Sequence, residues 1–168
     1  LRRQRQMCIR DRSIALEKND EIICGGVYQP LTDEFYWAVK GKGAFCNNLR
    51  LRVSKKENLN QCMLGTGIPH RGMQGHESYL PGLEKLMSNV AGIRRMGAAS
   101  LDLVYTASGK FDGYWEKNLK LVDIAAGSII VKEAGGRVTD FKGRNNYLES
   151  GEIVASNFVI HDKLLSEI

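Results

Sequence analysis

The stretch that most constrains the fold lies between residues 111 and 136, where a strand, a polar loop and a helix follow one another. Side chains alternate in direction from Phe111 to Glu116, as along a strand, so Tyr114 and Glu116 share one face. Apolar residues then recur at helical spacing until two glycines end the pattern. In open α/β folds, ligands bind beyond the carboxyl ends of the strands. We therefore expect Glu116, at the strand end, and Asp123, at the helix start, to line one crevice.

The position of Asp123 allows two interpretations. An Asp at a helix start caps free N–H groups and interacts favourably with the helix dipole, typically by ~1 kcal/mol. Alternatively, its carboxylate oxygens suit a hard cation such as Mg²⁺, with Glu116 as the acceptor for a substrate hydroxyl. Spacing alone favours the capping role and leaves the metal role open.

A second candidate site is the small-residue turn formed by Gly97, Ala98 and Ala99. It follows a short strand-like run, and a helical apolar period continues from it to Gly109. Small residues at a helix start let a ligand approach unpaired backbone N–H groups. They equally permit close packing of a helix on a sheet, and the spacing does not decide between these roles.

Several stretches together resemble the inositol monophosphatase family. The string VDIAAGSIIVKEAGG, preceded by YWE and followed by RVTDF, is similar to the carboxyl-terminal signature of that family. Three further stretches are similar and occur in the family's order: VYQPLTDEFYWAVKGKGAFCNN, RRMGAASLDLVYTASGKFDGYWE and SGEIVASN. The resemblance covers the chain from about Ser13 to its end. One departure is that Leu121 and Val122 stand where the family usually has Pro-Trp before the Asp.

The resemblance implies an α/β fold, namely the α+β layered sandwich of the sugar-phosphatase type, here truncated to a β meander followed by an α/β half. It also implies Mg²⁺-dependent hydrolysis of phosphate monoesters, in which metal ions activate a water molecule. Asp123 matches a catalytic, metal-binding Asp that also contacts the substrate. Glu116 matches a residue that accepts hydrogen bonds from the inositol ring, and Gly97, Ala98 and Ala99 match a substrate-facing turn.

The family's other metal ligands lie in an Asp-Pro-x-Asp-Gly-Thr motif and an earlier Glu, and neither is found in this chain. Because one carboxylate cannot hold a metal pair, we expect an inactive carboxyl-terminal portion of an inositol-phosphate phosphatase. One alternative is a related phosphatase acting on fructose 1,6-bisphosphate or 3'-phosphoadenosine 5'-phosphate. Another is a binding role with transcription or RNA-processing machinery, as in some bacterial proteins similar to the family. A homodimer is a candidate assembly.

The formal net charge of +5 is concentrated at the start of the chain. Residues 1–12, LRRQRQMCIRDR, contain five Arg and one Asp, with no apolar periodicity and no signal-peptide core. We expect this stretch to be a foreign or artefactual basic tail, with a natural basic arm as the alternative. The other 156 residues carry 19 basic and 18 acidic side chains, so they lack the basic footprint of nucleic-acid binding.

The rest of the chain predicts two regions. In residues 13–60, runs rich in β-branched and aromatic residues alternate with turn residues, which predicts an antiparallel meander with an exposed edge at its first strand. In residues 61–168, strands alternate with helices, which predicts an α/β region. The expected strands of the meander are Ile14–Leu16, Ile22–Tyr28, Glu34–Lys40 and Gly43–Val53.

The cysteines and histidines follow no zinc, redox or metalloprotease spacing. No apolar run reaches the ~20 residues that a membrane span requires. We therefore expect reduced thiols, a cytoplasmic location and no membrane partner.

Overall fold

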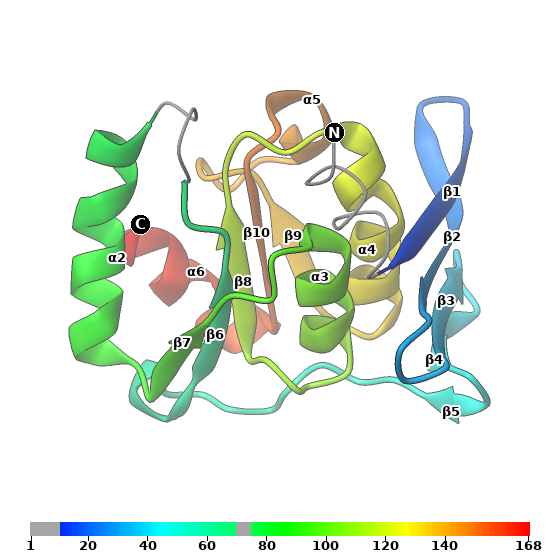
Figure 1. The fold of residues 1–168 in the computed structure, drawn as a ribbon, viewed down its shortest axis with the longest axis horizontal. Helices are drawn as coiled ribbons and strands as arrows, with labels where there is room; N and C mark the ends of the chain where they lie inside the picture. Colours follow the sequence, from blue (N-terminus) through cyan, green and yellow to red (C-terminus); the bar gives the residue numbers. More distant parts are fainter. Residues whose placement is uncertain (1–10, 70–74) are drawn as a thin grey trace.

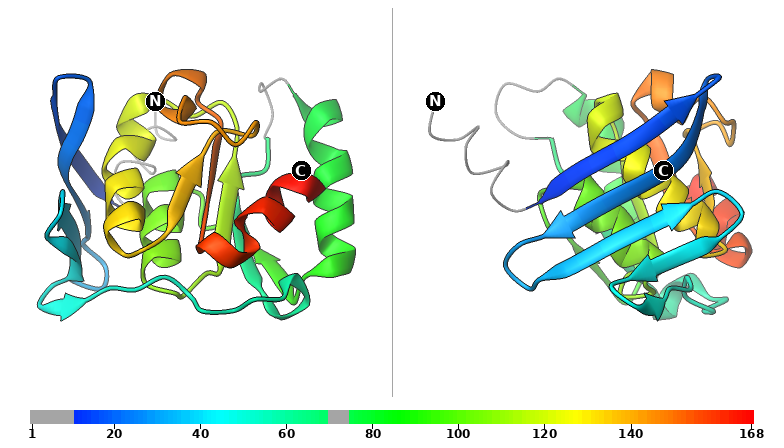
Figure 2. Two further views of the ribbon diagram at one scale, coloured as in Figure 1. Left: turned by 180° about the vertical axis from the view of Figure 1, so that it is seen from behind. Right: turned by 90° about the vertical axis from the view of Figure 1, so that its right-hand side faces the viewer.

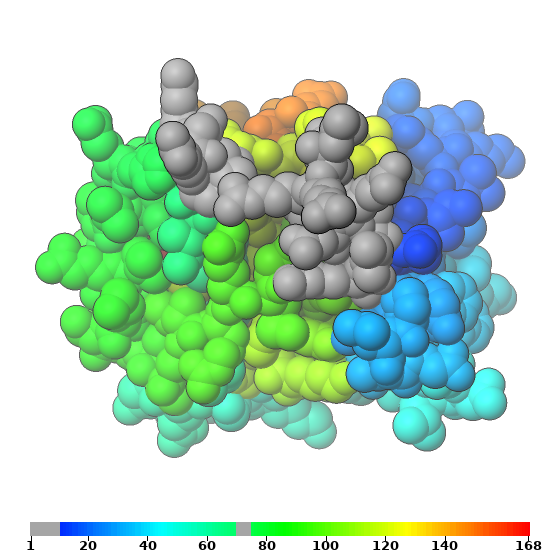
Figure 3. Space-filling view, viewed as in Figure 1, coloured from blue at the N-terminus to red at the C-terminus, as the bar shows by residue number. Residues whose placement is uncertain are grey.

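A computed structural model describes residues 11–69 and 75–168 and has four layers (Figure 1). A first five-stranded sheet, called sheet A, forms one outer layer. Helices α3 (Ala99–Ala107) and α4 (Leu121–Glu133) separate it from a second five-stranded sheet, called sheet B. Helices α2 (His76–Asn89) and α6 (Phe158–Glu167) cover the far face of sheet B. In the space-filling view, α2 and sheet A therefore lie at opposite sides of the molecule (Figure 3).

Sheet A is an antiparallel meander in which each strand pairs with the next along the chain. Its strands are β1 (Arg12–Lys18), β2 (Glu21–Gln29), β3 (Glu34–Val39), β4 (Gly43–Cys46) and β5 (Leu49–Arg50). The predicted meander is confirmed, but the single predicted strand Gly43–Val53 is wrong. A turn divides it at Asn47, whose φ of 51° is a left-handed conformation that Asn tolerates better than most residues.

The two faces of sheet A have different surroundings. The inner face packs on α4 so closely that a Cβ on Gly25 would lie 2.8 Å from the Cα of Ala126. The outer face carries exposed apolar side chains, including Ile14, Leu16 and Phe35, and none of the helices drawn in Figure 2 (right) lies over it. Strand β1 has β2 as its single strand neighbour within the described ranges, so the expected exposed edge is present.

Sheet B has the strand order β7-β6-β8-β10-β9. Its strands are β6 (Met63–Thr66), β7 (Gly92–Arg94), β8 (Gly113–Glu116), β9 (Arg137–Thr139) and β10 (Ile153–Ser156). Strands β6, β7 and β8 are parallel, whereas β10 is antiparallel to both of its neighbours. The predicted α/β half is therefore confirmed, with its parallel strands ending at a common edge.

The composition of helix α4 follows from its position between the two sheets. Helix α4 is apolar around most of its circumference because sheets A and B lie on either side of it. It ends at Glu133 with Ala134 as its C-cap residue, and the following Gly135 adopts a φ of 86°, as the predicted glycine stop requires. Two short elements, η1 (Leu59–Gln61) and α5 (Tyr147–Ser150), have no sequence period that would predict them. Among the described helices, none is long and apolar enough to cross a membrane.

Candidate active site

A cavity of about 940 Å³ opens at the carboxyl ends of the parallel strands of sheet B. Residues 67–69 follow β6, Gly97 lies in the loop after β7, and residues 116–119 end and follow β8. The first residues of α3 and α4 complete the wall. The cavity therefore lies where the strand-to-helix order predicted a ligand crevice.

All five residues proposed from the sequence line this one cavity. Glu116 ends β8, Asp123 lies in the first turn of α4, and Gly97, Ala98 and Ala99 form the turn that leads into α3. Residues separated by up to 26 positions in the sequence are thus brought to one wall. Their roles in catalysis and in metal and substrate binding remain predictions.

Asp123 is the third residue of α4, not the N-cap residue that its position predicted, because the helix begins at Leu121 with Lys120 as its N-cap; it caps the helix instead through a capping box. The backbone N–H of Lys120 donates to Asp123 Oδ2 at 3.0 Å, and the carboxylate is half-buried at the cavity wall. Leu121 and Val122, which replace the family's Pro-Trp, are exposed. The helix cap and the cavity position therefore coexist, and the replacement does not turn Asp123 away from the cavity.

The turn at Gly97 has the backbone features of a ligand-facing helix start. Gly97 adopts a φ of 79°, a conformation that glycine adopts at least cost. Ala98 is the N-cap residue of α3 and provides no side-chain cap for the first N–H groups of the helix. These N–H groups point toward the helix start, where the dipole favours an anion or a polar ligand group.

Glu116 is held from two sides by groups that sequence reasoning did not assign to the site. The Tyr114 hydroxyl donates to Glu116 Oε2, and the carboxyl group lies where a Cβ on Gly67 would stand. The alternation along β8 had placed Tyr114 and Glu116 on one face, which was the available signal. The contact of Gly67 with Glu116 has no signal in local spacing, because it depends on the pairing of β6 with β8.

Asp102 in α3 is the most unusual buried group near the cavity. It is 1% exposed, and neither carboxylate oxygen has a well-formed hydrogen bond within residues 11–69 and 75–168, since only a weak one from the Met96 backbone acts on the group. Burial, and secondarily the negative charge of Glu116, raises the pKa of Asp102 to about 8, against a smaller opposing effect of the Met96 backbone and of Arg95. At neutral pH this carboxyl group is therefore mainly protonated.

The cavity wall also carries charges of both signs. Arg95 and Lys117 line it, as do Asp11 and Arg12 from the end of the stretch expected to be a basic tail. The Ser100 hydroxyl donates to Asp11 Oδ2, and Arg12 begins β1. The rest of that stretch, residues 1–10, lies outside the described residues.

The residues present do not by themselves fit a catalytic metal pair. The described part of the chain contains no group of three or more His, Cys, Asp or Glu side chains that is arranged to hold a metal ion. Asp123 offers one carboxylate, and one of its oxygens already accepts the Lys120 N–H. Because Mg²⁺ sites use several oxygen ligands, further ligands would have to come from elsewhere.

Comparisons with known proteins identify the family to which the chain is similar. The model of the inositol monophosphatase family matches residues 1–168. The chain is 50% identical over 145 residues to an inositol-1-monophosphatase of Rhizobium meliloti, covering 86% of this chain and 54% of that protein. It is 44% identical over 158 residues to the Nus factor SuhB of Pseudomonas aeruginosa, covering 93% of this chain and 58% of that protein.

Solved structures show the same fold. The extragenic suppressor protein suhB of Bartonella henselae matches with a TM-score of 0.89 and 46% identity, over 92% of this chain and 59% of that protein. An inositol monophosphatase from Anabaena matches with a TM-score of 0.87 and 34% identity, over 92% of this chain and 62% of that protein. The chain thus spans little more than half the length of these relatives. It belongs to the inositol monophosphatase family.

Proposed function

We propose that this chain is the carboxyl-terminal portion of a Mg²⁺-dependent phosphatase that hydrolyses inositol monophosphates. The observation that carries the proposal is the convergence of Asp123, Glu116 and the turn at residues 97–99 on a single cavity. Family membership supports phosphate monoester hydrolysis as the reaction class. A volume of about 940 Å³ lies within the range of small-molecule sites and is ample for a polyol phosphate.

Each residue has a proposed role within this function. Glu116 would accept hydrogen bonds from ring hydroxyls, and the backbone at residues 97–99 would contact the ring. Arg95 and Lys117 on the cavity wall would attract the negatively charged phosphate. Asp123 would contribute one of several metal ligands, with the others supplied by the part of the relatives' length that this chain does not span. The chain alone is therefore expected to be inactive.

The test compares the 168-residue chain with the full-length protein that contains it. We expect Mg²⁺-dependent phosphate release from inositol 1-phosphate by the full-length protein and none by the chain alone. Release by the chain alone would contradict the ligand count. A full-length protein that prefers fructose 1,6-bisphosphate or 3'-phosphoadenosine 5'-phosphate would replace the proposed substrate with one of the alternatives.

A binding role with transcription or RNA-processing machinery is a second proposal, motivated by relatives that carry the name Nus factor SuhB. It predicts that full-length Asp123→Asn still captures the same transcription proteins as the wild type. Loss of capture in that variant would tie binding to the phosphatase site instead. The nearly balanced charge of residues 13–168 argues against direct nucleic-acid contact as the main role.

We also propose a reducing, cytoplasmic environment. Cys24, Cys46 and Cys62 are free thiols, and burial raises the pKa of Cys62 to about 11, which keeps it unreactive. Fractionation of cells with an antibody to the protein tests the location.

A homodimer and boundaries after residues 12 and 60 are further proposals. Light scattering of the full-length protein tests the homodimer, and limited proteolysis of the full-length protein tests the boundaries.

A further inference from the structure

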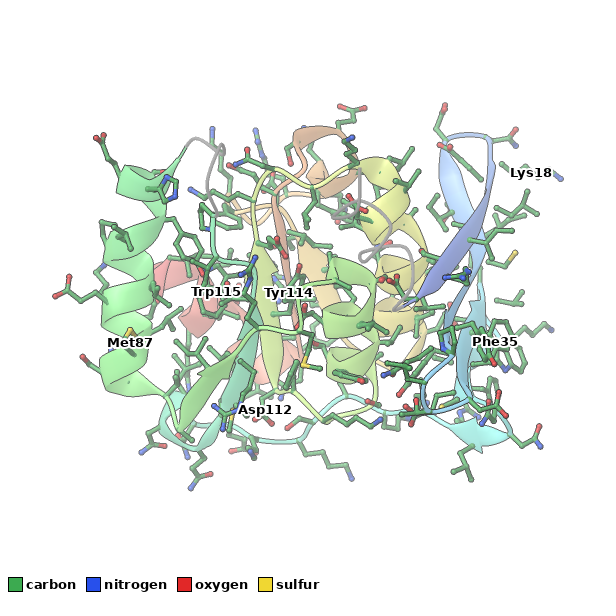
Figure 4. All side chains as sticks on the ribbon, in the orientation of Figure 1. Lys18, Phe35, Met87, Asp112, Tyr114 and Trp115 are labelled. Atoms are coloured by element: carbon green, nitrogen blue, oxygen red, sulfur yellow. The ribbon has the colours of Figure 1, made fainter. Side chains whose placement is uncertain are left out.

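Tyr114 is a buried phenol whose hydroxyl is committed to the candidate substrate residue. The side chain is 0% exposed and lies on the α3 side of β8, whereas the neighbouring Trp115 lies on the α2 side (Figure 4). Its hydroxyl donates to Glu116 Oε2, two residues further along the same strand face. Burial and the nearby carboxylates raise the phenol pKa well above its ordinary value, so Tyr114 keeps the proton that it donates.

Gly67 provides the space that the Glu116 side chain occupies. Strands β6 and β8 are parallel, and their register places Thr66 beside Trp115, so the next residue of each strand, Gly67 and Glu116, are neighbours. A Cβ on Gly67 would overlap the carboxyl carbon and both oxygens of Glu116. The carboxylate is therefore confined by the Tyr114 hydroxyl along its own strand and by the bare Gly67 backbone of the adjacent strand.

Asp102 approaches the same side of the sheet without adding a competing charge. Its Oδ1 would lie 3.2 Å from a Cβ on Gly65, the residue that pairs with Tyr114. An ionised carboxylate here would repel Glu116 across a poorly solvated interior. Because Asp102 is mainly protonated at neutral pH, Tyr114 donates to Glu116 without a second buried negative charge beside it.

We propose that Tyr114 is a positioning residue that fixes the Glu116 carboxylate over Gly67, and that it thereby sets the selectivity of the cavity for substrates whose hydroxyl groups Glu116 accepts. Tyr114 is not among the residues that line the cavity, so its proposed action on a substrate is through Glu116. It removes the rotational freedom of Glu116, so that the carboxylate is already oriented when a polyol phosphate binds. The inference rests on the proposed polyol-phosphate function and adds the residue that enforces its selectivity.

The test uses the full-length protein with Tyr114→Phe, which removes the hydroxyl and keeps the ring. Hydrogen bonds to charged groups are among the stronger ones, so we expect KM for inositol 1-phosphate to rise about tenfold or more. p-Nitrophenyl phosphate has no ring hydroxyls, so the fold-increase in its KM should be at least about five times smaller than that for inositol 1-phosphate. The matched control is Tyr105→Phe, because Tyr105 also donates a hydrogen bond, to Gln29 Oε1 at 2.9 Å, but lies outside the cavity wall.

Equal effects on the two substrates, or equal effects of Tyr114→Phe and Tyr105→Phe, would overturn the inference. If the wild-type protein releases no phosphate from inositol 1-phosphate, the proposed function fails, and a second measurement decides the positioning role. Crystal structures of wild type and Tyr114→Phe should then show the Glu116 carboxylate displaced from Gly67 or spread over several rotamers in the variant. An unchanged, well-ordered Glu116 in the variant would reject the positioning role whatever the substrate.

Discussion

Two buried polar clusters touch sheet B, and they differ in how well their hydrogen bonds are satisfied. In the first, called the site cluster (Asp102, Tyr114 and Glu116), Asp102 has no well-formed hydrogen bond in the described part of the chain. In the second, called the histidine cluster (Thr139, Ser156 and His161), both ring nitrogens of His161 are paired. Thr139 Oγ1 lies 3.0 Å from Nε2, and Ser156 Oγ lies 2.9 Å from Nδ1.

This difference in hydrogen bonding distinguishes the site cluster, which lies beside the cavity, from the histidine cluster, which supports the fold. Buried polar groups are normally paired, so an unpaired carboxyl group lowers the stability of the fold that holds it. Such a cost is found next to the cavity, in the site cluster, whereas the distant histidine cluster joins β9, β10 and α6 without one. Buried polar groups with unsatisfied hydrogen bonds tend to be found at functional sites, and Asp102 follows that tendency.

The largest expected effect is on the site cluster. The folded-state pKa of Asp102 is raised from 3.8 to about 8, so the native state binds more protons than the unfolded state between these values. Stability is therefore lost as the pH rises through this window. Asp102→Asn should raise the free energy of unfolding at pH 8 by roughly 5 kcal/mol and leave it nearly unchanged at pH 4, as measured by urea unfolding.

Asp112→Asn provides the control for that comparison. Asp112 is also a buried Asp, but its Oδ2 accepts from Lys56 Nζ at 2.9 Å and from the Met63 N–H at 2.6 Å. This substitution should destabilise the protein, because it weakens satisfied, charge-assisted hydrogen bonds. If both Asn variants changed stability in the same direction at pH 8, the contrast between paired and unpaired carboxyl groups would be wrong.

The histidine cluster should show the opposite pH dependence. Burial, followed by the positive charge of Arg137, lowers the pKa of His161 from 6.5 to about 4, so the unfolded state binds more protons between these values. Stability should therefore fall by roughly 3 kcal/mol as the pH drops from 6.5 to 4. His161→Gln should remove most of this pH dependence, whereas His76→Gln at the exposed start of α2 should leave it intact. A His161 imidazole that titrates near pH 6.5 by NMR in the wild-type protein would refute the account.

The smallest expected effect on stability belongs to Gly67. In Gly67→Ala, the three atoms nearest the new Cβ all belong to the Glu116 carboxyl group, whose displacement would break its hydrogen bond with Tyr114. Unfolding should therefore change by about 1 kcal/mol, while KM for inositol 1-phosphate rises about tenfold in the full-length protein. Gly65→Ala is the matched variant, because its Cβ would lie 2.9 Å from the buried Phe111 ring. It should destabilise by about 1–3 kcal/mol. A Gly67→Ala protein with unchanged KM would show that the position of Glu116 does not matter.

The sequence predicted the parts of this architecture that depend on local order. Glu116 and Asp123 belong to one strand-to-helix crossing, and the turn at Gly97 follows another strand of the same sheet, so their meeting at the strand ends was predictable. The Asn47 turn that splits a strand was missed, because apolar residues continue on both sides of it.

The supporting groups of the site were missed for a different reason. Gly67 approaches Glu116 only through the β6–β8 register, which joins residues 49 positions apart. Asp102 loses its contact with water only because α3 lies between two sheets. Such relations depend on tertiary packing, and no spacing rule within the chain expresses them.

The central claim is that the carboxylate of Asp123 serves the cavity as well as the helix cap. Asp123→Asn in the full-length protein tests it directly, because Asn retains an oxygen that can accept the Lys120 N–H while losing the negative charge. We predict that Mg²⁺-dependent phosphate release from inositol 1-phosphate falls by about a hundredfold or more, with a melting temperature within about 3 °C of the wild type. Release within about threefold of the wild type would contradict the account, because Asp123 would then be a helix cap and nothing more.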